Sequence, residues 1–576
     1  MKRILAFLIL ILLLAAMIPV QAQPVDGFSV GREAILSSLY EADIATLREA
    51  IDLGLVSCEE LTAYYLERIR TYNEPYNCFI TICDDALDVA RQRDQAMAEG
   101  ADRGILFGVP IVIKDNIDLV GYHTTNGHRK NDSQIADANA EVVDYLLAEG
   151  AVIIAKANMS TDAQSAWNSV SEAVGQTKNA YSTYISSAGS SGGSAVSVSL
   201  NFTVASLGTD TNSSLRLPAA YAGCVSLRAT HGLVSLEGVT KLNSSRDIPG
   251  AITRTVYDQA LMLDVLTGGA YGYTKNLNGN ALQGLRIGIL KELSYPVSSI
   301  PERNASNFDP EVVAAFEAAL EELRACGAEL VEVSFSQIFN LSQATFNTND
   351  NAKKDAFHDA FQRFLDRNEI CAVVFPTYLT TPLRTGTDAN GKYWSVWDQQ
   401  LVNNCRVLSP SASLPEITVP IGLHSLGCGI GMEIAAPRNQ EQLLLDIAYS
   451  YTTRYDHRQL PEGAPDAYAG ANVGSLTQII DGYKAFLDAQ KPTEPPVEPT
   501  EPETQPAQPT QPSEQPTQPA TKPANPKPVT PDGQLPVADE APFSTWMVIF
   551  LVASALAIVI AGVLIYDKIA HGKKKK

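Results

Sequence analysis

Basic residues are scarce in this chain relative to acidic ones, and no cysteine pair has the spacing of a metal site. The 576 residues contain 43 Lys and Arg against 64 Asp and Glu, which gives a formal net charge of −21. Nucleic-acid binding requires clustered Lys and Arg that replace phosphate counterions, so we expect no nucleic-acid partner. None of the eight cysteines falls in a CxxC pair, so the sequence predicts no metal and no cofactor. Cys78 and Cys83 form the one close pair, and a disulfide between them stays open.

Two long apolar runs flank the rest of the chain. Residues 1–22 have a basic start, an apolar stretch and small residues at the end, which is typical of a secretory signal peptide. Residues 544–566 carry no charge and, at about 1.5 Å per residue, are long enough to cross a bilayer core as a transmembrane helix. The lysine-rich tail 567–576 predicts a cytoplasmic C-terminus, with everything before the helix outside the cell.

A proline-rich segment precedes the predicted transmembrane helix. Residues 491–543 are rich in Pro, Thr, Glu and Gln, which favours an extended, disordered stalk. The hexapeptide 535–540 (LPVADE), with the apolar run and basic tail, resembles the sorting signals of Gram-positive surface proteins. Ala538 and Asp539 stand where that pattern has Thr and Gly, so we expect retention by the membrane helix. The predicted location is a bacterial cell membrane, spanned once.

Residues 23–490 alternate between helical and strand patterns without an internal linker. Ser57 to Glu60 fit a capping box at the start of a helix. Residues 109–114 form an apolar strand, and residues 139–149 a helix that ends at Gly150. This alternation predicts one large α/β domain, with a sheet covered by helices on both faces.

A lysine ends one of the predicted strands. The segment 108–116 reads GVPIVIKDN, and Lys114 follows its apolar run. A single lysine is usually a solvated surface charge. Here the apolar run places the amine at the rim of a buried layer, where desolvation lowers the pKa and allows a neutral amine to act as a base.

Two segments rich in Ser and Gly follow the lysine. Residues 189–194 (GSSGGS) bring backbone N–H groups and hydroxyls together, but no Lys-Ser or Lys-Thr follows, which excludes a P-loop. By itself this segment predicts a flexible loop. Residues 208–220 (GTDTNSSLRLPAA) follow an apolar run and place Ser214 in a tight turn.

Together the three segments resemble the amidase signature family in order, spacing and flanking residues. Residues 150–158 and 414–434 are also similar to that family, so the resemblance covers most of residues 35–455. Among its members the peptide-amidase-like branch is the nearer. The resemblance implies a large mixed-sheet α/β/α sandwich and a Ser-Ser-Lys triad that hydrolyses carboxamide C–N bonds through an acyl-enzyme intermediate. The implied substrate is a small-molecule or peptide amide, and the oligomeric state is open.

The resemblance also assigns a role to each member of the triad. Lys114 is the base, Ser190 is a bridging serine that follows a cis peptide bond, and Ser214 is the nucleophile. A hydroxyl needs a positioned base to become a good nucleophile, and the same base later returns the proton to the leaving amine. Four backbone N–H groups are placed to stabilise the oxyanion. They belong to Thr211, Asn212, Ser213 and Ser214.

One feature departs from the family pattern. Gly-Gly usually precedes the nucleophile, whereas this chain has Asn212 and Ser213. Glycine permits unusual backbone angles and close approach, so we expect an oxyanion hole that is tighter or differently shaped. Asp210 and Arg216 are expected to support the turn by an ion pair or hydrogen bonds, and His231 to be structural or pocket-lining.

Two other interpretations stay open. Residues 189–193 also fit a G-x-S-x-G nucleophile elbow, in which Ser191 would be the nucleophile of a different serine hydrolase. Alternatively, the departure at Asn212 and Ser213 would suit a catalytically inactive amidase fold that acts as a surface binding protein.

Overall fold

The computed structural model of the protein describes residues 28 and 30–490, apart from 102, 131–132, 298–299, 301–302, 347 and 387–402. The predicted signal peptide 1–22, stalk 491–543, transmembrane helix 544–566 and tail 567–576 lie outside the described residues. Within the described part, every helix is too short or too polar to cross a membrane. All eight cysteines are free thiols, Cys78 and Cys83 included.

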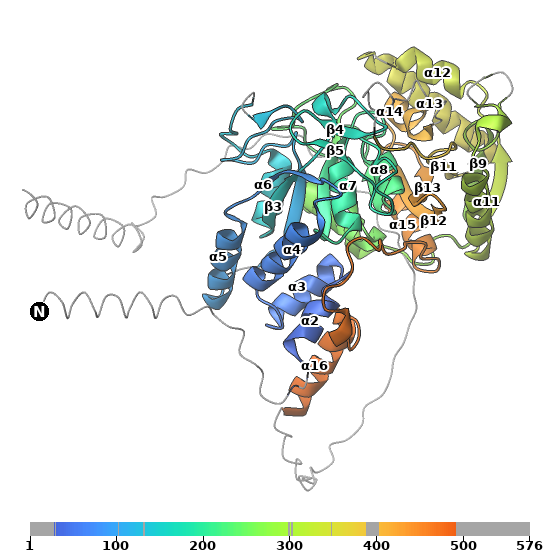
Figure 1. Ribbon diagram of the computed structural model, residues 1–576. Helices are drawn as coiled ribbons and strands as arrows, with labels where there is room; N and C mark the ends of the chain where they lie inside the picture. Colours follow the sequence, from blue (N-terminus) through green and yellow to red (C-terminus); the bar gives the residue numbers. More distant parts are fainter. Residues whose placement is uncertain are drawn as a thin grey trace, which may run out of the picture. The chain divides into compact units, whose positions relative to one another are not determined.

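Eleven strands form one mixed sheet in the described part of the chain (Figure 1). Strand β2 runs parallel to β3 and β6, and β9 runs parallel to β10 and β11, whereas the other neighbouring pairs are antiparallel. In spatial order the strands are β1 (Phe79–Ile82), β3 (Val152–Ala157), β2 (Pro110–Lys114), β6 (Ala205–Asp210), β8 (Ile248–Thr253), β7 (Val225–Arg228), β12 (Glu416–His424), β13 (Cys428–Ala435), β11 (Ala372–Pro376), β9 (Arg286–Leu290) and β10 (Glu329–Val333). The expected large mixed sheet is therefore present.

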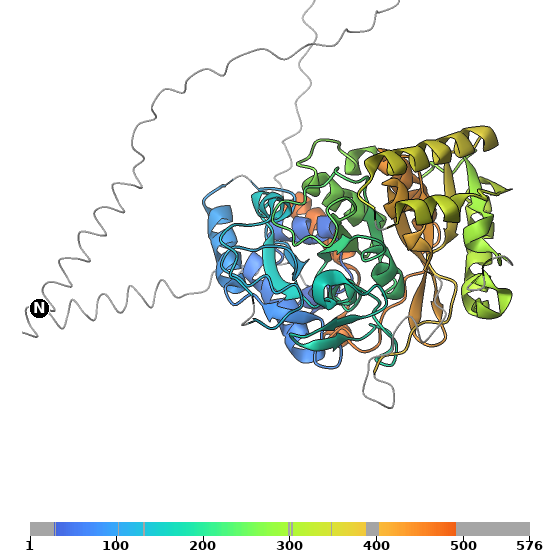
Figure 2. The ribbon, with the colours of Figure 1, turned by 90° about the horizontal axis from the view of Figure 1, so that it is seen from above.

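Helices pack along this sheet. Helix α7 lies beside α8 and α9 lies beside α15, and both pairs contact its central strands. In Figures 1 and 2, α4 and α5 lie at one end of the molecule and α11, α12 and α13 at the other. The helices are α2 (Arg32–Ser38), α3 (Ile44–Asp52), α4 (Cys58–Tyr72), α5 (Ala86–Ala98), α6 (Glu141–Ala148), α7 (Gly192–Ser199), α8 (Arg216–Tyr221), α9 (Val256–Leu266), α10 (Lys291–Ser294), α11 (Pro310–Ala325), α12 (Ile338–Thr345), α13 (Asn351–Asn368), α14 (Ser409–Ala412), α15 (Glu441–Thr452) and α16 (Leu476–Gln490). A separate hairpin joins β4 (Ser169–Ser171) to β5 (Gly175–Thr177).

Local sequence signals explain several element boundaries. The capping box before α4 is formed: Ser57 Oγ accepts from the N–H of Glu60 at 3.1 Å, and the Glu60 carboxylate accepts from the N–H of Ser57 at 3.0 Å. Gly150 has a φ of +88° after α6, a conformation that favours glycine. The predicted strand 109–114 corresponds to β2, which is buried along its whole length.

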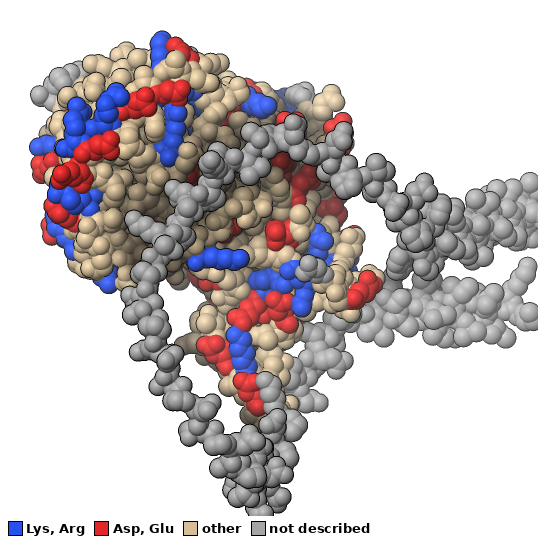
Figure 3. Space-filling view, turned by 180° about the vertical axis from the view of Figure 1, so that it is seen from behind, with Lys and Arg blue, Asp and Glu red and all other residues tan. Residues whose placement is uncertain are grey.

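Basic and acidic side chains are mixed on the surface. On the face shown in Figure 3, the blue Lys and Arg side chains alternate with red Asp and Glu side chains. The described residues on this face therefore carry no continuous basic area of the kind that binds nucleic acid.

Helix α11 packs against one end of the sheet through a stripe of apolar side chains. Asp309 caps the helix by accepting from the N–H of Glu311 at 2.9 Å. Its buried residues recur at helical spacing against β10, β11 and β12. They are Val312, Phe316, Ala319, Leu320 and Leu323.

We expect Phe316→Ala to lower the free energy of unfolding by about 3–5 kcal/mol, because Phe316 is 1% exposed and its removal leaves a cavity. Urea unfolding followed by circular dichroism measures the change. Glu317→Gln on the exposed side of the same helix is the control and should change stability by less than about 0.5 kcal/mol. Equal effects of the two substitutions would contradict this packing of α11.

Candidate active site

The predicted catalytic residues gather at the carboxyl ends of two parallel strands. Lys114 is the last residue of β2, and Thr209 lies near the end of its parallel neighbour β6. Ser190 lies just before α7, and Ser214 lies in the turn between β6 and α8. Because parallel strands end at the same sheet edge, segments about 100 residues apart meet at one site.

Lys114 is fully buried and surrounded by hydroxyl groups. Its Nζ donates to Ser190 Oγ at 2.7 Å and to Thr209 Oγ1 at 2.8 Å. Burial lowers the pKa of Lys114 to about 7, although the charges of Asp210 and Asp247 act in the opposite direction. Near neutral pH the amine therefore exists in both protonation states, which suits a general base and acid.

Ser190 follows a cis peptide bond between Gly189 and Ser190, as the family resemblance implies. The carbonyl oxygen of Ser190 accepts from the N–H of Ser160 at 3.3 Å and from Ser169 Oγ at 3.2 Å. A side chain on Gly189 would meet the carbonyl oxygen of Asn168 at 2.3 Å, so this position accommodates only glycine.

Ser214 is held through its backbone. Its carbonyl oxygen accepts from the N–H of Ser191 at 3.3 Å, and the residue is 6% exposed. The Ser214 hydroxyl makes no hydrogen bond to any described residue, Ser190 included. The N–H groups of residues 212–214 likewise donate to no described residue and are available to an oxyanion.

Asn212 and Ser213 adopt ordinary backbone angles. Neither is among the residues with positive φ, so the turn does not require the conformation that glycine supplies. Their side chains point to protein partners: Asn212 Oδ1 accepts from Arg246 Nη1 at 2.9 Å, and Ser213 Oγ accepts from Asn403 Nδ2 at 3.0 Å. The departure from Gly-Gly therefore imposes no left-handed strain on the turn.

Comparisons with known proteins identify the family of this chain. The Amidase family profile matches residues 60–349. A glutamyl-tRNA(Gln) amidotransferase component from Synechococcus sp. (strain CC9311) is 30% identical over 496 residues, which cover 73% of this chain and 99% of the relative. The chain belongs to the amidase family.

Solved structures of this fold are also similar. Peptide amidase from Stenotrophomonas maltophilia matches with a TM-score of 0.61 at 26% identity and covers 74% of this chain and 99% of its own. A 6-aminohexanoate cyclic dimer hydrolase matches with a TM-score of 0.61 at 22% identity and the same coverage of both chains, which shows the shared fold.

The turn between β6 and α8, which carries Ser214, is held by a cluster of buried charged side chains. Arg216 Nε donates to Asp210 at 3.2 Å, which confirms the expected pair, and Arg228 donates to the same carboxylate at 3.1 Å. Arg216 also contacts Glu416, and it lies 3.4 Å from Glu433. Burial raises the pKa of Glu416 well above its usual range, although the charge of Arg216 acts in the opposite direction.

The Ser191 hydroxyl and the His231 ring form structural hydrogen bonds that do not involve the side chains of Lys114, Ser190 or Ser214. Ser191 is fully buried, and its Oγ accepts from the N–H of Thr209 at 3.3 Å and donates to the carbonyl of Thr209 at 3.2 Å. A nucleophile elbow requires an exposed hydroxyl, so this geometry does not favour Ser191 as nucleophile. His231 Nε2 donates to the carbonyl of Ser244 at 3.0 Å, a structural contact.

Sequence reasoning missed two residues of the site. Thr209 Oγ1 accepts from Lys114, and Asn116 Nδ2 donates to the same oxygen at 3.1 Å. Both lie within the segments that carry the family resemblance. The available signal was their position at the ends of adjacent parallel strands, where polar side chains converge.

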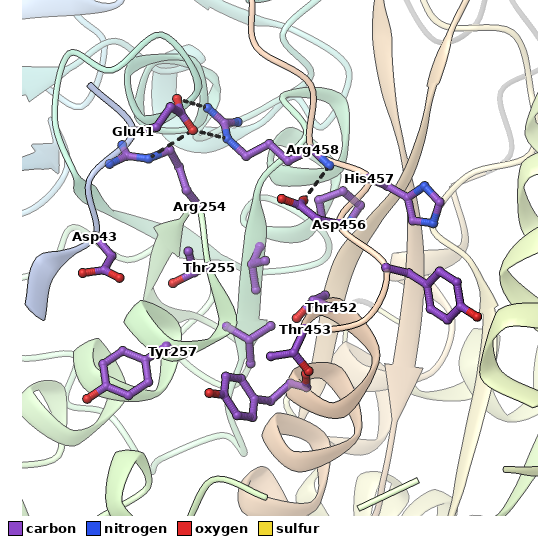
Figure 4. A pocket seen from close by; sticks show the side chains of 15 residues that line it. Glu41, Asp43, Arg254, Thr255, Tyr257, Thr452, Thr453, Asp456, His457 and Arg458 are labelled. Atoms are coloured by element: carbon purple, nitrogen blue, oxygen red, sulfur yellow. Dashed lines mark hydrogen bonds and ion pairs between the residues drawn. The ribbon is translucent and has the colours of Figure 1, made fainter. Parts of the chain in front are cut away.

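Two cavities bear on ligand binding. One of about 340 Å³ includes Asn403 in its wall and therefore adjoins the nucleophile turn. The other, of about 400 Å³, contains an ion pair of Glu41 with Arg458 (Figure 4). Neither cavity has Lys114, Ser190 or Ser214 among its described lining residues. The described residues include no cluster of three His, Cys, Asp or Glu side chains that could hold a metal.

We expect Arg216→Met to lower the free energy of unfolding by about 3–5 kcal/mol, because it leaves Glu433 buried without its arginine partner and Asp210 with Arg228 alone. Arg324→Met is the control, since Arg324 pairs only with exposed Glu321 on α11 and should cost less than about 1 kcal/mol. Urea unfolding of both variants measures the difference, and equal losses would contradict the anchoring role of the cluster.

Proposed function

We propose that this chain hydrolyses linear amide C–N bonds with Ser214 as nucleophile and Lys114 as base. The observation that carries the proposal is the fully buried amine of Lys114, which lies 2.7 Å from Ser190 Oγ and has a pKa of about 7. A lysine in this state accepts a proton without the help of a histidine or a metal-bound water.

The proposed reaction has two halves. Ser214 Oγ attacks the amide carbon, while its proton passes to Ser190 and the Ser190 proton passes to neutral Lys114. The free N–H groups of residues 212–214 stabilise the oxyanion. The Lys114 ammonium then returns a proton through Ser190 to the leaving nitrogen, which departs as ammonia or an amine. Water cleaves the acyl-enzyme by the same transfers and releases the carboxylic acid.

Thr209 and Asn116 act as positioning residues in this scheme. Thr209 Oγ1 accepts from the Lys114 amine, and Asn116 donates to the same oxygen, so the two residues hold the amine within reach of Ser190. Among the described residues the amine has hydroxyl partners and no carboxylate contact, which would raise its pKa and keep it protonated.

We also propose that the amidase domain acts outside the cell, anchored by residues 544–566. The signal-peptide pattern of residues 1–22 and the basic tail support this location. An extracellular chain is unsuited to the tRNA-linked role named for its curated relatives, so a peptide amide or another carboxamide is the better substrate. The ordinary backbone of Asn212 and Ser213 weakens the case for an inactive binding protein.

The full-length protein should release ammonia from at least one member of a panel of peptide, aliphatic and aryl amides. Lys114→Ala and Ser214→Ala should each lower kcat/KM by about 10³-fold or more, because triad members act as a unit. Ser191→Ala should keep measurable turnover. The reverse pattern, with loss in Ser191→Ala and retention in Lys114→Ala, would establish the elbow interpretation. Turnover that survives in Ser214→Ala would also contradict the proposal.

The pH profile provides a separate test of Lys114. Because the base must be neutral, kcat/KM should rise with pH through about 7 and level off above it. Asp247→Asn removes a negative charge that raises the pKa of Lys114, so the midpoint should move to lower pH. A profile that is flat between pH 5 and pH 9 would contradict Lys114 as the base.

A further inference from the structure

The cavity beside the nucleophile turn combines aromatic walls with arginine side chains. It has a volume of about 340 Å³. Its lining includes Trp167, Arg303, Phe339, Phe346, Asn403 and Arg406. Trp167 lies just before β4, Phe339 and Phe346 lie in α12 and at its C-terminal end, and Asn403 and Arg406 lie at the short helical turn Asn404–Arg406 (Figure 1 shows α12 and β4). Arg303 lies between α10 and α11.

Two hydrogen bonds join this cavity to the catalytic turn. Asn403, in the cavity wall, donates to Ser213 Oγ at 3.0 Å, one residue before the nucleophile. Arg246 donates to Asn212 Oδ1 at 2.9 Å, and its guanidinium lies 5.0 Å from the ring centre of Phe346, which is also in the wall. These contacts connect the cavity wall to the side chains of the two residues that precede Ser214.

Arg303 brings one positive charge to the wall and has no carboxylate partner among the described residues. It is 4% exposed and lies 4.9 Å from the ring centre of Phe339. Its guanidinium donates to neutral oxygens, the carbonyl of Glu292 at 3.0 Å and Asn404 Oδ1 at 2.6 Å. Burial lowers the pKa of Arg303 to about 10, so it is charged at neutral pH.

Arg406 brings a second charge and is more open. It is half-buried, with its guanidinium 5.0 Å from the ring centre of Phe346. Among the described residues it has no hydrogen bond and no ion pair. The described residues that line the cavity include no Asp or Glu.

Other buried arginines in the chain have either carboxylate partners or neutral oxygen acceptors. Arg68, which is 3% exposed, donates only to backbone carbonyl oxygens among the described residues. Arg216 and Arg228 share Asp210, and Arg458 pairs with Glu41. Burying a charge without a counterion is unfavourable, and a planar guanidinium binds a carboxylate through two parallel hydrogen bonds. Arg406 has neither kind of partner among the described residues, and in a chain of net charge −21 this indicates that a ligand supplies the negative charge.

We propose that this cavity binds an ionised carboxylate on the acyl portion of the substrate, with Arg406 as its principal contact and Arg303 contributing positive charge. The substrate class is then an amide whose acyl group carries a second acid behind an apolar spacer, which packs against Trp167, Phe339 and Phe346. This assignment rests on the proposed amide hydrolysis, because it deepens the choice of substrate for that reaction.

Matched amides that differ only at the far end test the assignment. The probes are adipamic acid and hexanamide, which have the same chain length but end in a carboxylate and a methyl group. The full-length protein should prefer adipamic acid in kcat/KM by about tenfold or more, as expected for a charge-assisted pair. Equal values for both amides would overturn the assignment.

Two substitutions at Arg406 separate charge from packing. Arg406→Gln should reduce the ratio of the two kcat/KM values by about tenfold, and Arg406→Lys, which keeps the charge, should reduce it less. Arg324→Gln on the exposed side of α11 is the matched control and should leave the ratio unchanged. Equal reductions in Arg406→Gln and Arg406→Lys would show a packing role and overturn the assignment.

Binding without turnover distinguishes this assignment from the proposed reaction. Calorimetry on full-length Ser214→Ala protein measures the affinities for adipamic acid and hexanamide directly. Tighter binding of adipamic acid, with no hydrolysis of any amide by the parent protein, would support the carboxylate site and contradict the proposed reaction. Equal binding of the two probes would overturn the carboxylate site even if hydrolysis is observed.

Discussion

The guanidinium of Arg216 joins the nucleophile turn to the central sheet. From a fully buried position it contacts Asp210 at the end of β6, Glu416 on β12 and Glu433 on β13, and it donates to the carbonyls of Asn212 and Cys405. These contacts use the donors of a rigid, planar group, which fixes orientation as well as distance. The turn therefore presents its N–H groups to substrate from a framework that spans several strands, and preorganisation of this kind is what oxyanion stabilisation requires.

The charge balance around this turn also sets the chemistry of Lys114. Burial favours the neutral amine, and the nearby charges of Asp210 and Asp247 partly offset that effect. Because Arg216 and Arg228 compensate Asp210, its field at Lys114 is moderated, and the amine can exchange protons near neutrality. Asp210 thus interacts both with Arg216, which holds the turn of Ser214, and with the charge of Lys114.

The cavity that includes Asn403 and Arg406 in its wall has a different charge pattern from the surroundings of Lys114. Around Lys114 the protein supplies both signs of charge, whereas the adjoining cavity has arginines without carboxylate partners among its described lining residues. The replacement of Gly-Gly by Asn212 and Ser213 is connected to this cavity, since their side chains contact Arg246 and Asn403. These two residues link the turn before Ser214 to the cavity wall, so the departure from the family pattern bears on the cavity that we propose for the acyl group.

The sequence by itself determined the α/β alternation, the burial of β2 that ends at Lys114, and the three segments that identify the amidase family. These features depend on residues close together in the chain, where periodicity, capping and short motifs act. The signal peptide, stalk and membrane helix stay predictions from composition. Only the tertiary structure brought Thr209 to Lys114, Glu416 to Arg216 and Asn403 to Ser213, because each contact joins distant segments through strand pairing and burial. For the same reason, only the fold could decide that Asn212 and Ser213 need no glycine-like backbone and that Ser191 is a buried structural hydroxyl.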